Sequence, residues 1–374
     1  MALFIRLYAK FVEVMEITRE NRKWLDDLQL SHPLVIAGPC SAETEEQVLE
    51  TAHALKDSDV TMLRAGVWKP RTRPGSFEGV GAIALPWLMR AKKETGLQIA
   101  IEVGSAMHVK IALQYDIDVL WLGARTTVNP FLVQEIAEAL NGTDKVVLVK
   151  NPVNPDLSLW LGAVERLQAQ GIKNLGVIHR GFSTYRKTDY RNNPQWQIPI
   201  DLKSMHPDLP LICDPSHITG NREMIFDVCQ TALDLRFDGL MVETHPTPDQ
   251  AWSDAAQQIT PATMIQIMED LRIRKKDFSD ASVTENLEHI RTDINNLDTK
   301  IIGLLSQRMK LAEDIGTLKK KDNVSILQSE IWKRTLAQMK DQGANGGLSD
   351  SFIDAFYKAI HQESIHHQQK MFEE

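Results

Sequence analysis

Eight short apolar runs, spaced along the first 275 residues, are the feature of this chain that most restricts its fold. The runs are Leu34–Pro39, Val60–Val67, Gln98–Val103, Val119–Gly123, Val146–Val149, Asn174–Ile178, Pro210–Ile212 and Gly239–Val242. At the end of each run, or shortly beyond it, stands a residue able to do chemistry: Cys40, Lys69, Glu102, Arg125, Lys150, Arg180, His217 and Glu243. In a (β/α)8 barrel all strand carboxyl ends open onto one face, where active sites are built. The pattern therefore predicts a barrel enzyme with its site on that face.

Helical patterns separate the runs. They cover Glu45–Lys56, Gly81–Thr95, Ser105–Tyr115, Pro130–Asn141, Leu157–Gln170, Asn221–Leu235, Thr247–Gln257 and Pro261–Arg274. Alternating strands and helices imply a parallel sheet, and eight cycles imply that the sheet closes. Two connections, Val67–Gly79 and Gly181–Leu209, are long. Long loops on a barrel rim usually shape a substrate pocket.

Length and composition indicate an ordinary globular protein of two domains. The chain has 374 residues, of which 43% are hydrophobic and 25% charged, and its net charge of -8 gives no reason to expect nucleic acid as a partner. No apolar window approaches the ~18 residues of a membrane span. The cysteines Cys40, Cys213 and Cys229 lie far apart and are odd in number, which fits a reducing cytoplasm.

A change of pattern near residue 280 marks the second domain. We expect a short N-terminal extension at 1–30, a barrel at 31–275, a polar linker at 276–284 and an all-α domain at 285–374. Apolar residues from Leu287 to Leu318 recur mostly every three or four positions, which predicts one long helix with a bundle-type seam. Two further helices are expected at about Gln328–Lys340 and Ser349–Met371.

Four residues after the first, seventh and eighth runs belong to the types that bind metals. They are Cys40, His217, Glu243 and Asp254. Singly, each has an ordinary explanation, such as a small core cysteine or a surface charge. Because those three strands are neighbours in a closed barrel, the joint placement favours a site. Thiolate, imidazole and carboxylates suit a divalent transition metal such as Mn, Fe, Co or Zn, which would act as a Lewis acid on a carbonyl oxygen.

Six cationic residues fall near strand ends. They are Arg64, Lys69, Arg71, Arg125, Lys150 and Arg180. Any one of them has a simple explanation as a solvated rim charge, but six on one rim would repel one another unless anions lie between them. Arginine forks match both phosphate and carboxylate. The set therefore predicts two phosphorylated or carboxylated ligands.

The motifs at these positions resemble those of the 3-deoxy-D-arabino-heptulosonate 7-phosphate (DAHP) synthase family, in its shorter Iβ-like form. The motifs are Gly38-Pro39-Cys40-Ser41, Arg64-Ala65-Gly66, Lys69-Pro70-Arg71-Thr72, Gly123-Ala124-Arg125, His179-Arg180-Gly181, Cys213-Asp214-Pro215-Ser216-His217 and Glu243-Thr244-His245-Pro246. The resemblance covers roughly residues 30–275. It implies condensation of phosphoenolpyruvate with erythrose 4-phosphate, the entry step of the shikimate pathway, with release of phosphate.

The same resemblance implies roles for individual residues. Cys40, His217, Glu243 and Asp254 would bind the metal. Phosphoenolpyruvate would be held by Arg64, Lys69, Arg125, Lys150 and Arg180, and erythrose 4-phosphate by Lys69, Pro70, Arg71 and Thr72. Lys69 would protonate the aldehyde oxygen, and Glu102 would position water.

Two local comparisons refine the resemblance. His179 stands where close relatives are expected to have an acidic residue, which concerns the fine tuning of Arg180. The related 3-deoxy-octulosonate 8-phosphate synthases, which use arabinose 5-phosphate, are expected to have an Ala-Asn type sequence after the lysine. Because Pro70-Arg71-Thr72 follows Lys69 here, that family ranks below the first.

In the second domain, Arg308 occupies a seam position where an apolar residue would continue the pattern. Lys319 lies eleven residues later and so on the same helical face, whereas Arg291 lies seventeen residues earlier, roughly 100° around the helix. An unpaired buried arginine is costly. Patterning alone leaves two alternatives equal: an anionic ligand, to which a partner chain would supply Arg291, or an ion pair within the bundle.

Residues 285–374 resemble an all-helical chorismate mutase, on Leu287-x-x-Ile290-Arg291-x-x-Ile294, Leu305-x-x-Arg308-Met309-x-Leu311-Ala312, Ile315-Gly316-x-x-Lys319 and Ser364-Ile365-x-x-Gln368. The resemblance implies an intertwined homodimer that rearranges chorismate to prephenate by means of Arg291, Arg308, Lys319 and Gln368. Ile331 and Trp332 take the places of the family's Arg-Glu pair, so the contact with the substrate hydroxyl is altered.

Two functions follow from the sequence. The first is a cytoplasmic bifunctional enzyme, synthase plus mutase, with feedback control through the helical domain. The alternative is a synthase whose helical domain mainly senses chorismate or prephenate and dimerises the chain.

Overall fold

The computed structural model describes residues 21–70, 75–185, 188–275, 278 and 281–373. The chain forms two compact units, Met1–Arg274 and Lys275–Glu374. Each unit is described by itself below.

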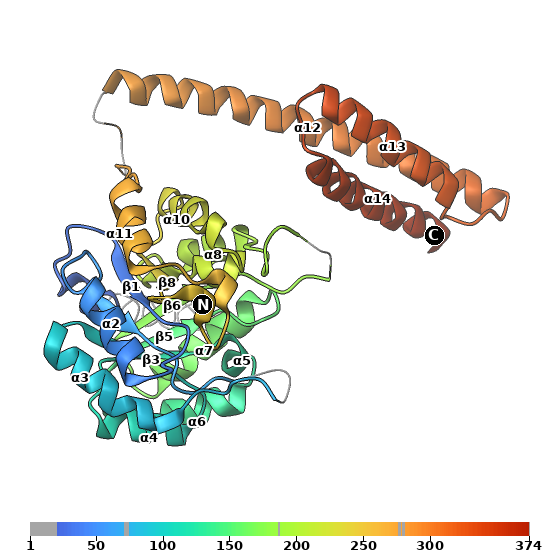
Figure 1. The fold of residues 1–374 in the computed structure, drawn as a ribbon. Coiled ribbons are helices and arrows are strands. Elements are labelled where there is room, and N and C mark those ends of the chain that lie inside the picture. Colours follow the sequence, from blue (N-terminus) through green and yellow to red (C-terminus); the bar gives the residue numbers. More distant parts are fainter. Residues whose placement is uncertain (1–20, 71–74, 186–187, 276–277, 279–280, 374) are drawn as a thin grey trace, which may run out of the picture. The chain divides into compact units, whose positions relative to one another are not determined.

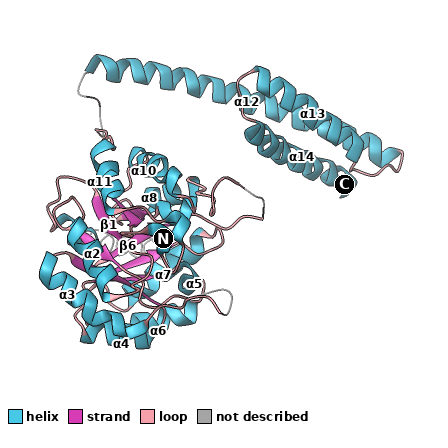
Figure 2. Cartoon of the chain, in the orientation of Figure 1, coloured by secondary structure: helices cyan, strands magenta, loops and turns pink. Residues whose placement is uncertain are grey.

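The first unit is a closed barrel of eight parallel strands, each paired with its neighbours in chain order (Figures 1 and 2). The strands are β1 (Leu34–Gly38), β2 (Met62–Arg64), β3 (Gln98–Val103), β4 (Val119–Leu122), β5 (Val146–Lys150), β6 (Leu175–His179), β7 (Leu211–Cys213) and β8 (Gly239–Glu243). Pairing of Leu34 with Gly239 and of Gly38 with Glu243 joins the first strand to the last. The closed barrel confirms the predicted fold class, and each predicted apolar run overlaps one strand.

Helices cover the outside of the barrel. They are α2 (Glu45–Leu55), α3 (Leu85–Thr95), α4 (Ala106–Gln114), α5 (Ala124–Thr127), α6 (Pro130–Leu140), α7 (Leu157–Ala169), α8 (Gln197–Met205), α9 (Pro215–Thr219), α10 (Ile225–Asp234) and α11 (Pro261–Asp270). Short 3-10 segments lie at Gly81–Ala84, Arg222–Met224, Pro248–Gln250 and Ala255–Gln257. The prediction of a helix at Thr247–Gln257 is wrong. Two 3-10 segments take its place, and Asp254, which lies between them, has a left-handed φ of 47°.

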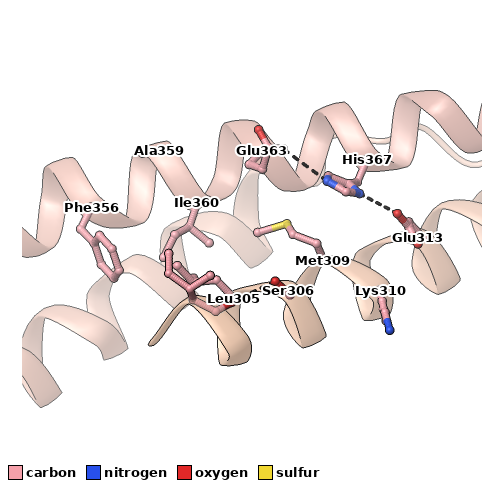
Figure 3. Close-up of a pocket in the computed structure, with 11 residues that line it drawn as sticks. Leu305, Ser306, Met309, Lys310, Glu313, Phe356, Ala359, Ile360, Glu363 and His367 are labelled. Atoms are coloured by element: carbon pink, nitrogen blue, oxygen red, sulfur yellow. Dashed lines mark hydrogen bonds and ion pairs between the residues drawn. The ribbon is translucent and has the colours of Figure 1, made fainter. Parts of the chain in front are cut away.

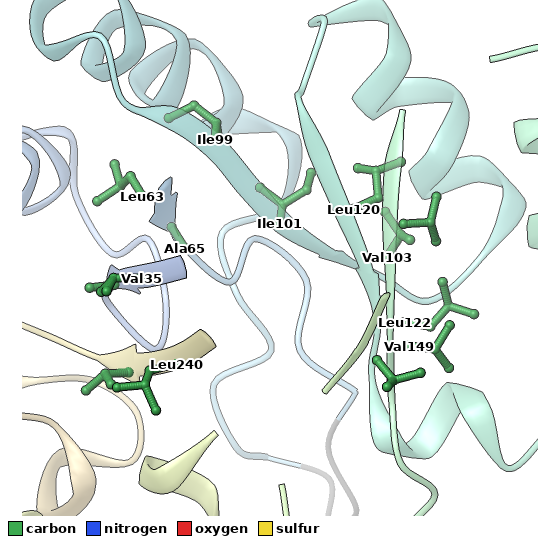
Figure 4. Packing of buried hydrophobic residues seen from close by; sticks show 14 of the residues in the cluster. Val35, Leu63, Ala65, Ile99, Ile101, Val103, Leu120, Leu122, Val149 and Leu240 are labelled. Atoms are coloured by element: carbon green, nitrogen blue, oxygen red, sulfur yellow. The ribbon is translucent and has the colours of Figure 1, made fainter. Parts of the chain in front are cut away.

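Alternation along the strands divides the core into two clusters. One set of strand residues, including Leu63, Ile101 and Leu120, points outward toward the helices (Figure 4). The other set fills the barrel interior, together with Trp24 and Leu25 from the helical residues 21–26.

The interior cluster closes the amino-terminal end of the barrel. The indole nitrogen of Trp24 donates to the carbonyl of Leu175 at 2.9 Å, and Arg22 Nη1 donates to Asp238 Oδ1 at 2.7 Å. Because Leu175 and Asp238 stand at or just before the starts of β6 and β8, these contacts leave the carboxyl ends of the strands free to build a site.

The second unit is a three-helix arrangement of α12 (Ala281–Lys321), α13 (Ser329–Asn345) and α14 (Asp350–Glu373). Helix α14 packs against both others. At Gly343 an added Cβ would lie 2.5 Å from Ile353 Cγ1, so glycine lets α13 and α14 approach closely. Within the described ranges, no helix combines the length and apolar character needed to cross a membrane.

Apolar residues on α12 remain exposed in the single chain. Ile290 and Ile294 are 50% and 51% exposed, and Leu297 and Leu304 are 56% and 64% exposed. These residues belong to the predicted seam. The second unit therefore presents an apolar face that its own helices leave uncovered.

Candidate active site

The close meeting of β1 and β2 places the first site residues. Gly38 has a φ of +146°, and a Cβ there would lie 2.2 Å from the carbonyl oxygen of Arg64. Only glycine fits such an approach. The chain then turns so that Cys40 follows β1 and Arg64 ends β2 on the same rim.

The four proposed metal-ligand residues lie near one another at this rim. Cys40 Sγ is 3.4 Å from Asp254 Oδ2, and His217 Nε2 is 3.8 Å from Glu243 Oε1. The thiol is fully buried. Burial, followed by the charges of Glu243 and Asp254, raises the pKa of Cys40 to about 11.

Cationic side chains contact three of the four proposed ligand residues. Lys69 Nζ lies 3.0 Å from Cys40 Sγ, Arg64 Nη2 lies 3.1 Å from Glu243 Oε1, and Arg191 Nη1 lies 2.9 Å from Asp254 Oδ1. Among the described residues, no three His, Cys, Asp or Glu side chains are arranged so that they could hold a metal ion. The donor types suit a transition metal, but a bound ion would have to displace some of these cations.

Asp214 orients two of the predicted site residues from behind. Its carboxylate accepts from Lys150 Nζ at 2.7 Å and lies 2.8 Å from His217 Nδ1, which leaves His217 Nε2 facing Glu243. Burial alone would raise the pKa of Asp214, but His217 and Lys150 hold it well below its usual range. A carboxylate on the far nitrogen of a histidine is the usual support of a metal-binding imidazole.

Arg64 and Lys150 form a buried cationic floor around Trp121. Arg64 is 1% exposed and Lys150 is 3% exposed. The guanidinium carbon of Arg64 lies 5.0 Å from the indole centre, and Lys150 Nζ lies 5.6 Å from it. Two nitrogens of Arg64, Nε and Nη1, have no hydrogen-bond partner. Buried donors of this kind are normally paired, which points to an anion that is not part of the chain.

Arg180 and Arg125 extend the cationic rim. Arg180 is buried, and its side chain is held by Asn192 Oδ1 at 2.6 Å while Asn151 Oδ1 accepts from its backbone nitrogen at 2.7 Å. Burial and the nearby charges of Arg191 and Arg125 lower the pKa of Arg180 to about 10 despite the presence of Asp214. Arg125, by contrast, is exposed. The crowding of like charges again indicates an anion-binding site.

Glu102 lies in β3 and contacts the neighbouring strand β4 and the glycine that follows it. Trp121 Nε1 donates to Glu102 Oε2 at 3.3 Å. A Cβ at Gly123 would lie 2.0 Å from Glu102 Oε1, so the glycine leaves room for the carboxylate. Glu102 therefore keeps a fixed position next to the strand end that leads to Arg125.

The loop after β2 is held by backbone and aromatic contacts. Lys69 N donates to Glu78 O at 2.8 Å, which closes the loop at its base. Trp68 stacks on His108 of α4 with ring centres 4.1 Å apart, and Phe77 meets Trp252 edge to face at 5.3 Å. Pro70 is exposed at the start of the loop. The predicted residues Arg71 and Thr72 lie outside the described residues.

His179 faces away from this site. It is fully buried among Trp160, Phe182, Trp196 and Phe237, with ring centres 5.3–6.3 Å apart. Burial, and then the charge of Arg180, lowers its pKa to about 3. Its carbonyl accepts from the backbone nitrogen of Asp214 at 2.7 Å. The imidazole therefore belongs to the packing behind Arg180.

Sequence reasoning did not single out several residues that complete the site: Asn151, Arg191, Asn192, Asp214 and Gln257. Gln257 Nε2 donates to Glu243 Oε2 at 2.6 Å, and Gln257 Oε1 accepts from Arg191 Nη1 at 2.5 Å. Asp214 was within reach, because it stands three residues before His217 and caps α9. Arg191 lies in a long loop, where no local pattern marks it.

The helical unit has a pocket of its own, of about 310 Å³. Arg308, Lys319 and Gln368 line it, and Arg308 donates to Ser364 Oγ. The Oε1 atom of Gln368 is buried without a partner. Arg291 does not reach this pocket within the chain: it is exposed and pairs with Glu288, one turn away. Three of the four predicted residues are thus brought together.

The end of the barrel and the pocket of the helical unit both gather cationic side chains. The model of the DAHP synthetase I family matches residues 29–279, and that of chorismate mutase type II matches residues 290–369. The chain belongs to the DAHP synthetase I family and carries a chorismate mutase type II domain after its barrel.

The similar proteins include both a heptonate aldolase and an octonate aldolase. Phospho-2-dehydro-3-deoxyheptonate aldolase of Thermotoga maritima is 31% identical, over 64% of this chain and 68% of that protein. Its crystal structure superposes with a TM-score of 0.59 at 29% identity, again over 64% and 68% of the two chains. A 2-dehydro-3-deoxyphosphooctonate aldolase of Nitratidesulfovibrio vulgaris is 28% identical, over 59% of this chain and 84% of that protein.

Proposed function

We propose that this chain is a bifunctional enzyme. The barrel condenses phosphoenolpyruvate with erythrose 4-phosphate to DAHP and phosphate, and the helical domain rearranges chorismate to prephenate. The buried cationic floor of the barrel is the observation that carries the first activity, because Arg64 keeps two buried donors without a partner.

We assign phosphoenolpyruvate to this floor and its rim. Its carboxylate and phosphate together need several fixed donors, which Arg64, Lys69, Arg125, Lys150 and Arg180 supply. Burial strengthens each contact, since the charges act where water is excluded. Erythrose 4-phosphate is assigned to the adjoining loop, with Lys69, Pro70, Arg71 and Thr72.

Lys69 and Glu102 act on the reacting atoms in this proposal. The methylene carbon of phosphoenolpyruvate attacks the aldehyde carbon, water adds to the former enol carbon, and phosphate leaves. Burial would lower the pKa of Lys69, but Cys40 and Glu243 raise it above its ordinary value. Lys69 is therefore an ammonium that can protonate the aldehyde oxygen as it becomes a hydroxyl. Glu102, fixed by Trp121, would orient the water.

We further propose that Cys40, His217, Glu243 and Asp254 hold a divalent metal, of the Mn, Fe, Co or Zn type. A metal at this set supplies Lewis-acid activation of the aldehyde. The donor chemistry supports this, as does Asp214, which turns His217 Nε2 toward Glu243.

The mutase reaction needs no nucleophile, because the substrate rearranges internally. Cationic and hydrogen-bonding groups hold it compact and stabilise charge on the ether oxygen. We assign this work to Arg308, Lys319 and Gln368, with Arg291 of the partner subunit. The alternative, a sensing and dimerisation domain with weak mutase activity, is favoured by Ile331 and Trp332, which put two neutral side chains on the pocket wall.

A homodimer through the helical domain completes this assignment. A groove of about 580 Å³ runs between α12 and α14, with Leu305, Met309 and Ile360 in its wall (Figure 3). At one end His367 lies between Glu313 and Glu363, 2.6 and 3.2 Å away. Together with the exposed face of α12, this groove offers apolar surface that a second copy would bury. Feedback by prephenate would then act through the helical domain.

For the location of the protein we propose the cytoplasm, because its three cysteines are free and far apart in the sequence.

One purified sample tests both activities. Loss of phosphoenolpyruvate in the presence of erythrose 4-phosphate is followed before and after metal removal, after metal return, and with added prephenate, while chorismate loss is measured in parallel. We expect both activities, the first dependent on metal and inhibited by prephenate. Condensation without chorismate loss would favour the sensing alternative, and absence of condensation in metal-loaded protein would overturn the barrel assignment.

A further inference from the structure

A stacked pair of rings forms one wall of the helical pocket. Trp332 of α13 and His361 of α14 have ring centres 4.0 Å apart and planes inclined by 21°. Both side chains line the cavity that also holds Arg308, Lys319 and Gln368. The pair joins two helices and fixes the plane of the imidazole. Because ring nitrogens lie in that plane, they point past the indole face and not into it.

His361 stands in line with the other pocket residues of α14. Ser364 and Gln368 follow it by three and seven residues, which puts all three on one helical face. Ser364 and Gln368 are buried, and His361 is half-buried above them. The imidazole thus belongs to the same surface as the polar groups already assigned to the ligand.

Three polar side chains of this pocket are engaged within the chain. Ser364 Oγ accepts a hydrogen bond from Arg308 and donates one to the carbonyl of Ile360 at 2.8 Å. Lys319 Nζ donates to the carbonyl of Ile326. No hydrogen bond of the His361 ring is found among the described residues. On the α13 side, Ile331 adds apolar surface, and Thr335 adds a hydroxyl one turn further along the helix.

The charge state of His361 follows from its neighbours. Partial burial, and then the charges of Arg308 and Lys319, lowers its pKa. A neutral imidazole carries one donor and one acceptor nitrogen. The two cations can donate but not accept. His361 therefore adds an acceptor to the pocket, and a ligand hydroxyl needs an acceptor for its proton.

We propose that His361 is a specificity-determining residue of the helical pocket, which binds the ring hydroxyl of the dicarboxylate ligand while Trp332 holds the imidazole in position. This inference rests on the proposed function of the helical domain and deepens it. It accounts for the altered wall at Ile331 and Trp332: the hydroxyl contact moves from α13 to α14, and the residue at 332 supports it through stacking.

The test compares two ligands in two proteins. Dissociation constants are measured by titration calorimetry for prephenate and for the analogue that lacks only the ring hydroxyl, with the wild-type full-length chain and with His361→Leu. Because one net hydrogen bond is worth about 1 kcal/mol, we expect the wild type to prefer prephenate by about five- to tenfold. His361→Leu should bind both ligands alike, with the affinity that the wild type has for the analogue.

Matched variants distinguish a hydrogen bond made by His361 from a general effect of packing in the helical domain. His366→Leu removes an exposed histidine of the same helix, outside the pocket, and should keep the full preference. Trp332→Phe retains a stacking ring and should keep most of it, whereas Trp332→Leu should lose most of it. Circular dichroism and sedimentation of each variant establish that helix content and assembly are unchanged.

The outcomes separate the two hypotheses. If His361→Leu still prefers prephenate to the same degree as the wild type, the inference about His361 is overturned and the proposed function stands. If the wild type binds neither ligand and does not turn over chorismate, the proposed function of the helical domain falls, and the inference falls with it.

Discussion

The end of the barrel and the pocket of the helical domain both gather cations, yet they hold them in different ways. In the barrel, Arg64, Lys150 and Arg180 are buried and lie at, or just after, the ends of three different strands. In the helical domain, Arg308 and Lys319 are half-buried on one helix, and Arg291 is exposed. A closed barrel can therefore surround its ligand with one chain, whereas three helices leave a side open.

The difference extends to the supporting contacts. Lys150 and His217 share Asp214, and Arg180 is fixed by Asn192. Such contacts preorganise charges before a ligand arrives. Both sites keep buried polar atoms without a partner, on Arg64 in the barrel and on Gln368 in the helical pocket. In the proposed function one chain supplies the whole barrel site, whereas the helical site also takes Arg291 from a partner subunit.

The largest expected effect tests whether the two sites are independent. Lys69→Met removes the proposed proton donor, and we expect condensation to fall by about a thousandfold or more. Chorismate loss and bound metal, measured by elemental analysis, should stay unchanged. Near-normal condensation in this variant would refute the role of Lys69, and a parallel loss of mutase activity would show that the two sites are not separate.

The next effect tests whether the helical site needs two chains. Arg291→Ala and Arg308→Ala should each lower chorismate turnover by about a hundredfold or more, because each removes a cation from the charge developing on the ether oxygen. When the two variants are unfolded and refolded together, half of the dimers carry one site with both arginines. Activity should then recover to about a quarter of the wild type, as symmetric exchange requires.

Refolding each variant alone is the control for that experiment. Activity that stays absent in the mixture, although sedimentation shows dimers, would mean that Arg291 does not cross between chains. Condensation by the barrel should be the same in all samples, since its ligands are held within one chain.

Predictability from the sequence follows the same division. The strand ends were predictable because a short apolar run with a polar residue at or near its end is a local signal, and it led to Cys40, Arg64 and Lys150. Arg191 was not predictable, because its contact with Asp254 joins two loops 63 residues apart. Local patterning also failed around Asp254, where a left-handed φ interrupts the expected helix.

In the helical domain the sequence predicted positions more easily than contacts. Helical spacing separated Arg291 from Arg308 and Lys319, as the structure does. It gave no hint that Trp332 would stack on His361, because the pair comes from different helices. Periodicity reports which face a residue occupies and not what meets it there.

A smaller effect concerns the loop that carries Lys69. His108→Ala removes the ring on which Trp68 stacks, and His108→Phe keeps a ring in place. Since such a stack is worth about 1 kcal/mol, we expect His108→Ala to raise KM for erythrose 4-phosphate five- to tenfold. KM for phosphoenolpyruvate should rise much less, because Lys69 is only one of the five side chains assigned to that substrate. Equal increases in both constants, or no rescue by phenylalanine, would contradict a positioning role for the stack.

The smallest effect is a change in how stability depends on pH. The pKa of His179 is about 3 in the folded barrel, below its ordinary value of 6.5. Between these values the unfolded chain binds a proton that the folded chain does not, so the free energy of unfolding decreases as pH falls from about 6.5 toward 3. One such group contributes a slope of at most about 1.4 kcal/mol per pH unit.

His179→Leu removes this contribution and keeps the aromatic surroundings filled. Denaturant titrations followed by tryptophan fluorescence at pH 7, 6 and 5 should therefore show a shallower loss of stability in the variant than in the wild type. The exposed His366→Leu, by contrast, should follow the wild-type slope. Parallel slopes for all three proteins would mean that folding does not lower the pKa of His179, and would contradict this prediction. Condensation should stay near normal in His179→Leu, because the imidazole faces away from the site and only the backbone of residue 179 contacts Asp214.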